Sequence, residues 1–252
     1  MSPGWITAFL DFAPDHADVG ARFWSAVTGY DVSPRRGDTD EFATLVASDG
    51  DPFLRVQTLV EGDDRIHLDL HVANPRAAAD RAVGLGATVL ADLGYVVMRS
   101  PGGFAFCFVP HPGATRPAPA TWAGEHSSLV DQVCLDIPAS SYDVECEFWR
   151  DLTGWEPRAS AVSPDFQSLL RPEGQPLRLL FQRLGEPTGE VRAHLDWAAT
   201  DRAAETARHQ DLGAQVVDTR AVWTVLTDPV GRVYCITDRD PETGMLPPPP
   251  TG

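Results

Sequence analysis

The chain has 252 residues, 43% of them hydrophobic, with a formal net charge of −16 and a pI of about 4.7. This length is enough for two domains that each enclose a core. The negative charge disfavours nucleic acid and anionic membranes as partners, and no apolar run reaches the roughly 18–20 residues of a membrane span. Residues 1–5 lack the basic and apolar regions of a signal peptide. We therefore expect a cytoplasmic protein without nucleic-acid or membrane partners.

The first predicted unit is a strand followed by a helix and three more strands. Residues 5–12 alternate as a strand does, and the helical segment 16–28 places Val19, Phe23 and Val27 on one apolar stripe before Gly29 ends it. Three short strands are expected next, at residues 30–34, 42–47 and 53–59. This order is a βαβββ module.

The pattern then begins again. A strand is predicted over residues 67–72, and Asn74 and Pro75 open a helix as N-cap and first helical residue, with Gly86 closing it. Further strands are expected at residues 88–92, 95–100 and 104–109. The first half of the chain therefore consists of two βαβββ modules.

The second half repeats the first at an almost constant offset. Phe23-Trp24 returns as Phe148-Trp149, and His67-Leu68-Asp69 returns as His194-Leu195-Asp196. Repeats spread along both halves indicate duplication of a whole domain. We expect domains at 5–110 and 128–240, a Pro/Ala/Thr-rich linker at 111–127 and a disordered Pro-rich tail at 241–252. The stripe of the third helix would be Val144, Phe148 and Leu152.

The four cysteines are isolated and have no CxxC spacing, which argues against a disulfide scaffold. Cys134 and Cys146 lie inside apolar or helical patterns and are interpreted as small buried hydrophobes. Cys107 and Cys235 end equivalent strands of the two halves. Burial habits favour packed side chains there as well.

These signatures resemble the vicinal oxygen chelate superfamily. They are Phe-Trp before a Gly-aromatic step, His-Leu-Asp on a strand, Leu-Gly-Ala after a helix, and Asp228-Pro-x-Gly-x-x-x-Cys235 near the end. The superfamily includes glyoxalase I, extradiol dioxygenases, fosfomycin resistance enzymes and bleomycin resistance proteins. More narrowly, the chain resembles tandem glyoxalase-like domains that are common in actinobacteria. The resemblance implies an α+β fold in which the two βαβββ modules of each domain curl around a cleft.

The resemblance also implies where a divalent metal would be bound, because metal-dependent members place ligands on the first, fourth, fifth and eighth strands. Neither copy has the usual Glu at these positions. Carried over to this sequence, the positions are Thr7, Gln57, His67 and Cys107 in the first copy and Gln132, Gln182, His194 and Cys235 in the second. We expect Gln132, His194, Cys235, His67 and Cys107 as metal ligands, and Gln57, Gln182, Tyr95 and Trp223 as residues that bind substrate.

Strand alternation adds acid and base groups to the same inward face. His67, Asp69 and His71 share one side of their strand, and Asp11 on the first strand is predicted to converge with them. A carboxylate that orients an imidazole makes a general base. The second copy offers His194 and Asp196 as the equivalent pair, with Asp69 or Asp196 in the orienting role. The alternative is a buried hydrogen-bonded pair that fixes strand register.

Two functions follow from these residues. The first is an enzyme of lyase, isomerase or dioxygenase type that acts on a small oxygen-rich substrate, with or without a metal. The second is a protein of the bleomycin resistance type that binds a small molecule or antibiotic without chemistry, in a cleft lined by Trp5, Trp197 and Trp223. The tandem repeat favours domains that pair within one chain, as a monomer or a homodimer. One or both clefts would be functional.

Overall fold

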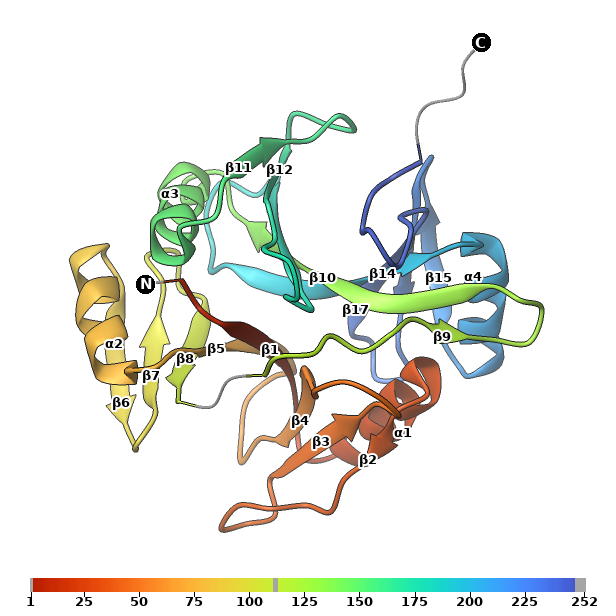
Figure 1. The fold of residues 1–252 in the computed structure, drawn as a ribbon, viewed down its shortest axis with the longest axis horizontal. Helices are drawn as coiled ribbons and strands as arrows, with labels where there is room; N and C mark the ends of the chain where they lie inside the picture. The colour runs from red at the N-terminus through yellow and green to blue at the C-terminus, as the bar shows by residue number, and fades with distance from the viewer. Residues whose placement is uncertain (1, 111–112, 248–252) are drawn as a thin grey trace.

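A computed structural model describes residues 2–110 and 113–247 (Figure 1). The first half contains β1 (Trp5–Phe12), α1 (Ala17–Thr28), β2 (Asp31–Val32), β3 (Phe42–Val46), β4 (Leu54–Thr58), β5 (Arg65–His71), α2 (Pro75–Gly84), β6 (Thr88–Asp92), β7 (Val96–Arg99) and β8 (Ala105–Val109). The second half contains β9 (Ala120–Thr121), β10 (Ser127–Ile137), α3 (Tyr142–Thr153), β11 (Pro157–Ala159), β12 (Phe166–Leu169), β13 (Arg178–Arg183), β14 (Arg192–Ala199), α4 (Arg202–Asp211), β15 (Gln215–Thr219), β16 (Trp223–Thr227) and β17 (Val233–Thr237).

Each half forms one sheet, ordered β2-β3-β4-β1-β5-β8-β7-β6 in the first and β11-β12-β13-β10-β14-β17-β16-β15 in the second. Within every module the first strand runs parallel to the last, as β1 does to β4, and the two modules of a half join through an antiparallel pair such as β1 and β5. The predicted fold, α+β with four βαβββ modules, is confirmed. Most of the predicted boundaries in the first half lie within two residues of the observed ones, although β2 is shorter than predicted.

Both faces of β1 are covered, which explains why all eight of its residues are buried. Thr7 and Asp11 point to the concave side of the sheet, and Ile6, Leu10 and Phe12 point to the core on the other side. Alternation along β1 therefore places its polar site residues on one face of the sheet and its apolar core residues on the other. The same separation holds on β10, where Gln132 faces the concave side and Val133 faces the core.

The two halves pack through the first helix of each. Trp24 of α1 stacks against Trp197 of β14 at a centroid distance of 5.2 Å, and its indole donates a hydrogen bond to Asp228 at 2.9 Å. Reciprocally, Trp149 of α3 packs on Phe106 of β8 at 5.3 Å. The Phe-Trp repeats are therefore core residues that join the halves, and α1 lies beside the second sheet (Figure 1).

The predicted helix stripes were wrong at one position each. Val19 is 37% exposed and Val144 is 47% exposed, whereas Trp24 and Trp149 are fully buried. Both helices are sandwiched between two sheets, so the buried arc is wider than one stripe and is displaced toward the tryptophans. The valines lie on the remaining solvent edge.

The connecting and terminal segments are more ordered than the sequence predicts. Within the linker predicted at 111–127, β9 pairs with the start of β10. Residues 241–247, expected in a disordered tail, instead form a turn in which Asp240 accepts from the backbone of Thr243, and Arg178 donates to the carbonyl of Gly244. Residues 111–112 and 248–252 lie outside the described residues. No helix in the described part of the chain is long and apolar enough to cross a membrane.

The packing of α1 gives a first testable prediction. A Cβ on Gly20 would overlap the ring of Phe12, which is fully buried, so we expect Gly20→Ala to destabilise the protein by about 1–3 kcal/mol through overpacking. Gly84 in α2 has open space around it, and Gly84→Ala should instead stabilise by about 0.5–1 kcal/mol. Urea unfolding of both variants checks the pair, and equal effects would contradict the packing of α1.

Candidate metal centre and clefts

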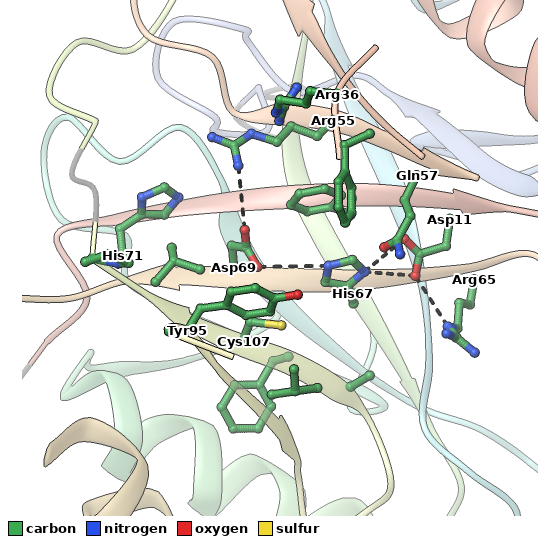
Figure 2. Close-up of a pocket in the computed structure, with 18 residues that line it drawn as sticks. Asp11, Arg36, Arg55, Gln57, Arg65, His67, Asp69, His71, Tyr95 and Cys107 are labelled. Carbon is green, nitrogen blue, oxygen red and sulfur yellow. Dashed lines mark hydrogen bonds and ion pairs between the residues drawn. The ribbon is translucent and has the colours of Figure 1, made fainter. Parts of the chain in front are cut away.

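The concave face of the first sheet encloses a cavity of about 470 Å³ (Figure 2). Its walls come from β1, β3, β4, β5, β7 and β8, so both modules contribute to one cleft. Most of the polar side chains lie on β5 and on the nearby strands β4, β1 and β8, on the inward face that strand alternation predicts. A volume of this size suits a small organic molecule.

His67 is held in one orientation by its neighbours. Its Nδ1–H donates to the carboxylate of Asp11, with distances of 2.9 Å to Oδ1 and 2.8 Å to Oδ2. Its ring stacks on Phe9, its cross-strand partner, at a centroid distance of 4.4 Å. Nε2 is therefore turned toward Asp69, whose Oδ1 lies 3.9 Å away. The orienting carboxylate is Asp11, and the orienting role predicted for Asp69 was wrong.

Charges of alternating sign follow one another across this cleft, as the dashed lines of Figure 2 show. Arg55 lies 3.8 Å from Asp69, and Arg65 lies 3.3 Å from Asp11. Burial alone would lower the pKa of His67, but Asp11 and Asp69 outweigh it and raise that pKa. Burial also raises the pKa of Asp69.

The second sheet encloses a cavity of about 380 Å³ with a closely similar centre. His194 Nδ1–H donates to Asp136 Oδ2 at 2.8 Å, and Nε2 lies 3.3 Å from Asp196 Oδ1. Gln132 donates its amide to the other oxygen of Asp196. Burial would raise the pKa of Asp196, but His194 and further polar partners outweigh it and lower that pKa. Cys134 takes the place that Phe9 has in the first half.

Each cleft brings a histidine nitrogen, a carboxylate oxygen and a thiol sulfur together. The ligand atoms of His67, Asp69 and Cys107 lie within 4.8 Å of one another, as do those of His194, Asp196 and Cys235. Asp196 Oδ1 is buried and has no hydrogen-bond partner in the described part of the chain. Imidazole, carboxylate and thiolate are all ligands of divalent transition metals, so the residues fit such an ion. Metal-binding histidines usually donate their other ring N–H to a carboxylate, as His67 does to Asp11 and His194 does to Asp136.

A sequence profile of the glyoxalase-like domain matches this chain twice, over residues 7–109 and 132–237. The chain belongs to the glyoxalase-like domain family. It carries two such domains in tandem, as the repeated motifs predict. No curated protein sequence matches the chain significantly.

Solved structures with the same fold include enzymes of several activities. A mutant of 4-hydroxymandelate synthase from Streptomyces coelicolor has a TM-score of 0.64 at 16% identity, covering 94% of both chains. The Mn(II)-bound glyoxalase from Novosphingobium aromaticivorans has a TM-score of 0.60 at 15% identity, covering 99% of this chain and 88% of that one. The 2,2′,3-trihydroxybiphenyl 1,2-dioxygenase from Sphingomonas wittichii has 0.60 at 15%, covering 97% and 94%. At these identities the likeness shows the fold alone.

The first glyoxalase-like domain does not bring all its predicted acid and base residues together. His71 lines the cavity, but it lies on the opposite side of Asp69 from His67 and Asp11 (Figure 2). Its Nε2 pairs with Thr7 Oγ1 at 2.9 Å. The predicted convergence was therefore wrong for His71, because two residues along β5 move a side chain by about 7 Å. The Thr7 hydroxyl is therefore engaged in a hydrogen bond with His71.

The predicted substrate-binding residues all line the cavities. Gln57 lies opposite Asp11 in the β1–β4 pair, and the Tyr95 hydroxyl is turned toward the centre beside Cys107 (Figure 2). In the second glyoxalase-like domain, Gln182 faces Cys134 at 3.8 Å, and Trp223 packs edge-on against Phe166. These positions agree with contact to a bound molecule, which stays a prediction.

Other predicted aromatic residues lie elsewhere. Trp5 and Trp197 are each 1% exposed in the core, so they line neither cleft. The arginines that line the first cleft were not predicted. Arg55 is two residues before Gln57 on β4, so strand alternation was a usable signal for it. Cys134 is buried as expected, but it also lines the second cleft.

Proposed function

We propose that this protein is a metal-dependent enzyme of lyase, isomerase or dioxygenase type that acts on a small molecule with two neighbouring oxygen atoms. The observation that carries the proposal is the Asp-oriented histidine in each domain, with Nε2 facing a carboxylate and a thiol. A residue held only for packing would not need a buried carboxylate to select its tautomer. The fold it shares with the Mn(II)-bound glyoxalase supports this proposal.

The residues of the first cleft have distinct roles in this proposal. His67, Asp69 and Cys107 would hold the ion, and Asp11 keeps the Nε2 lone pair of His67 directed at it. A bound divalent ion supplies Lewis-acid polarisation of the substrate oxygens. The Tyr95 hydroxyl faces the same region and is placed to donate a hydrogen bond to one of these oxygens (Figure 2).

The second cleft would use His194, Asp196 and Cys235 in the same way. Gln132, predicted as a ligand, donates its amide to Asp196 and so positions that carboxylate. A binding protein without chemistry has less support, since two of the three tryptophans expected in its cleft lie in the core.

The proposal is tested by turnover after loading with Mn²⁺, Fe²⁺ or Zn²⁺ separately. Oxygen uptake with catechols and spectroscopic assays with hydroxy-ketones cover the reaction types named. We expect turnover with at least one ion, and a loss of roughly 10²-fold or more in the His67→Ala, His194→Ala double variant. Near-UV circular dichroism controls for folding, and the two single variants assign activity to a cleft. Undiminished turnover in the folded double variant would rule out the proposal.

A further inference from the structure

Two arginines form one wall of the first cleft. Arg36, just before β3, and Arg55, on β4, both line the cavity and lie next to each other (Figure 2). Burial lowers the pKa of Arg55 in spite of the opposing effect of Asp69, and the charge of Arg36 lowers it further. Two neighbouring guanidinium groups repel each other, and the single carboxylate of Asp69, 3.8 Å from Arg55, offsets only part of their charge. The chain as a whole carries a net charge of −16, so the local positive charge of this wall is opposite in sign to the charge of the whole protein.

The hydrogen-bonding capacity of Arg55 is largely unused. Its Nε is buried and has no hydrogen-bond partner among the described residues. Its Nη1 is 3.8 Å from Asp69 Oδ2, which is an ion pair but too long for a hydrogen bond. The guanidinium also lies 5.5 Å from the ring of Phe9. A planar donor group is therefore held rigidly beside the cavity with donors left to satisfy.

The second glyoxalase-like domain lacks this arrangement. Register places Leu180 where the first domain has Arg55, and the turn that holds Arg36 has Ser160 at the matching backbone hydrogen bond. Three arginines line the second cleft, and each has a partner in the chain: Arg158 donates to the Met245 sulfur at 3.3 Å. Arg178 donates to the carbonyl of Gly244, and Arg239 pairs with Asp131. The first cleft thus differs from the second by an arginine at the register position of Arg55, where the second has Leu180.

We propose that the first cleft takes an organic acid, with its carboxylate bound by Arg55 and Arg36 and its paired oxygens at His67, Asp69 and Cys107. This inference rests on the proposed function, because it places the reacting end of the substrate at that centre. Guanidinium matches carboxylate in a two-point, planar contact. Asp69 lies between Arg55 and His67, so the acid group and the reacting oxygens occupy opposite ends of the molecule.

Calorimetry with matched probes tests the assignment. We would compare 3,4-dihydroxybenzoate with its amide, which differ only in the charged group, on Mn²⁺-loaded and on metal-free protein. The wild type is expected to bind the acid at least about 10-fold more tightly, and Arg55→Leu, which copies the second domain, should abolish that preference. Arg36→Met, at an exposed position, should reduce it if Arg55→Leu does not fold. Arg178→Met in the second cleft is the matched control and should keep the full preference.

The outcomes separate this inference from the proposed function. Arg55-dependent preference for the acid without turnover would support the acid site while the enzyme proposal fails. Turnover without preference for the acid, or no binding of either probe, would overturn the acid site. Inorganic phosphate that binds through Arg55 as tightly as the carboxylate would overturn it as well, in favour of a phosphate site.

Discussion

Replacing Glu205 by alanine is expected to lower the free energy of unfolding by roughly 3–5 kcal/mol. Glu205 on α4 is fully buried and is the shared acceptor of a polar network in the second domain. Its two oxygens accept hydrogen bonds from His126, Ser128, Arg208 and His209. Alanine would leave these buried donors without their acceptor. Urea unfolding measures the loss, and Glu242→Ala, at an exposed position, serves as the control.

The same network sets an acid limit on stability. Burial would raise the pKa of Glu205, but Arg208 and His209 outweigh it, so its folded pKa lies well below the ordinary value of 4.5. The stabilisation is therefore complete above about pH 4.5 and is lost as the pH falls toward the folded pKa. We expect a steeper acid loss in the wild type than in Glu205→Gln. Parallel curves for the two proteins would show that Glu205 does not carry this dependence.

Replacing Asp136 by asparagine is expected to weaken divalent-metal binding in the second cleft by about 10–100-fold. Asp136 is outside the proposed ligand set, and it accepts from His194 Nδ1–H at 2.8 Å. Asparagine can turn its amide toward Nδ1 and so favour the wrong tautomer, which would place the proton on Nε2. The fold should be little affected, because the side chains have the same shape.

Competition with a chelating dye measures that affinity, with His67→Ala as background so that only the second cleft is observed. Asp143→Asn removes an exposed carboxylate on α3 and serves as the matched control. An Asp136→Asn variant that retains wild-type affinity would mean that the hydrogen bond does not select the tautomer. A drop of the same size in the control would point to a loss of net charge instead.

The architecture could be predicted from the sequence because its main signals are short patterns of neighbouring residues. Repeated Phe-Trp and His-Leu-Asp signatures align the halves, and glycines such as Gly29, which adopts a positive φ of 72°, mark helix ends. Such signals depend only on neighbours along the chain. The width of the buried arc on α1 depends on a second sheet that no local pattern reveals, and for this reason Val19 was misplaced.

For the site, the sequence predicts which face of its strand each side chain lies on, but not which side chains contact each other. Alternation places His67, Asp69 and Asp11 inward, as observed. Which carboxylate meets Nδ1 depends on the register between β1 and β5, where His67 pairs with Phe9 and so comes next to Asp11. Likewise Arg55 reaches Asp69 from β4, across β1. One residue of slippage would turn these side chains to the other face.

The central claim, that each cleft holds a divalent ion on its histidine, carboxylate and thiol, is tested most directly by metal stoichiometry. Protein purified without chelator or affinity metal is dialysed against Mn²⁺ or Zn²⁺ and its ion content measured by elemental analysis. We predict roughly one ion per intact cleft, so about two for the wild type, one for His67→Ala or His194→Ala, and none for the double variant. A wild type that retains no more metal than the folded double variant would contradict the account.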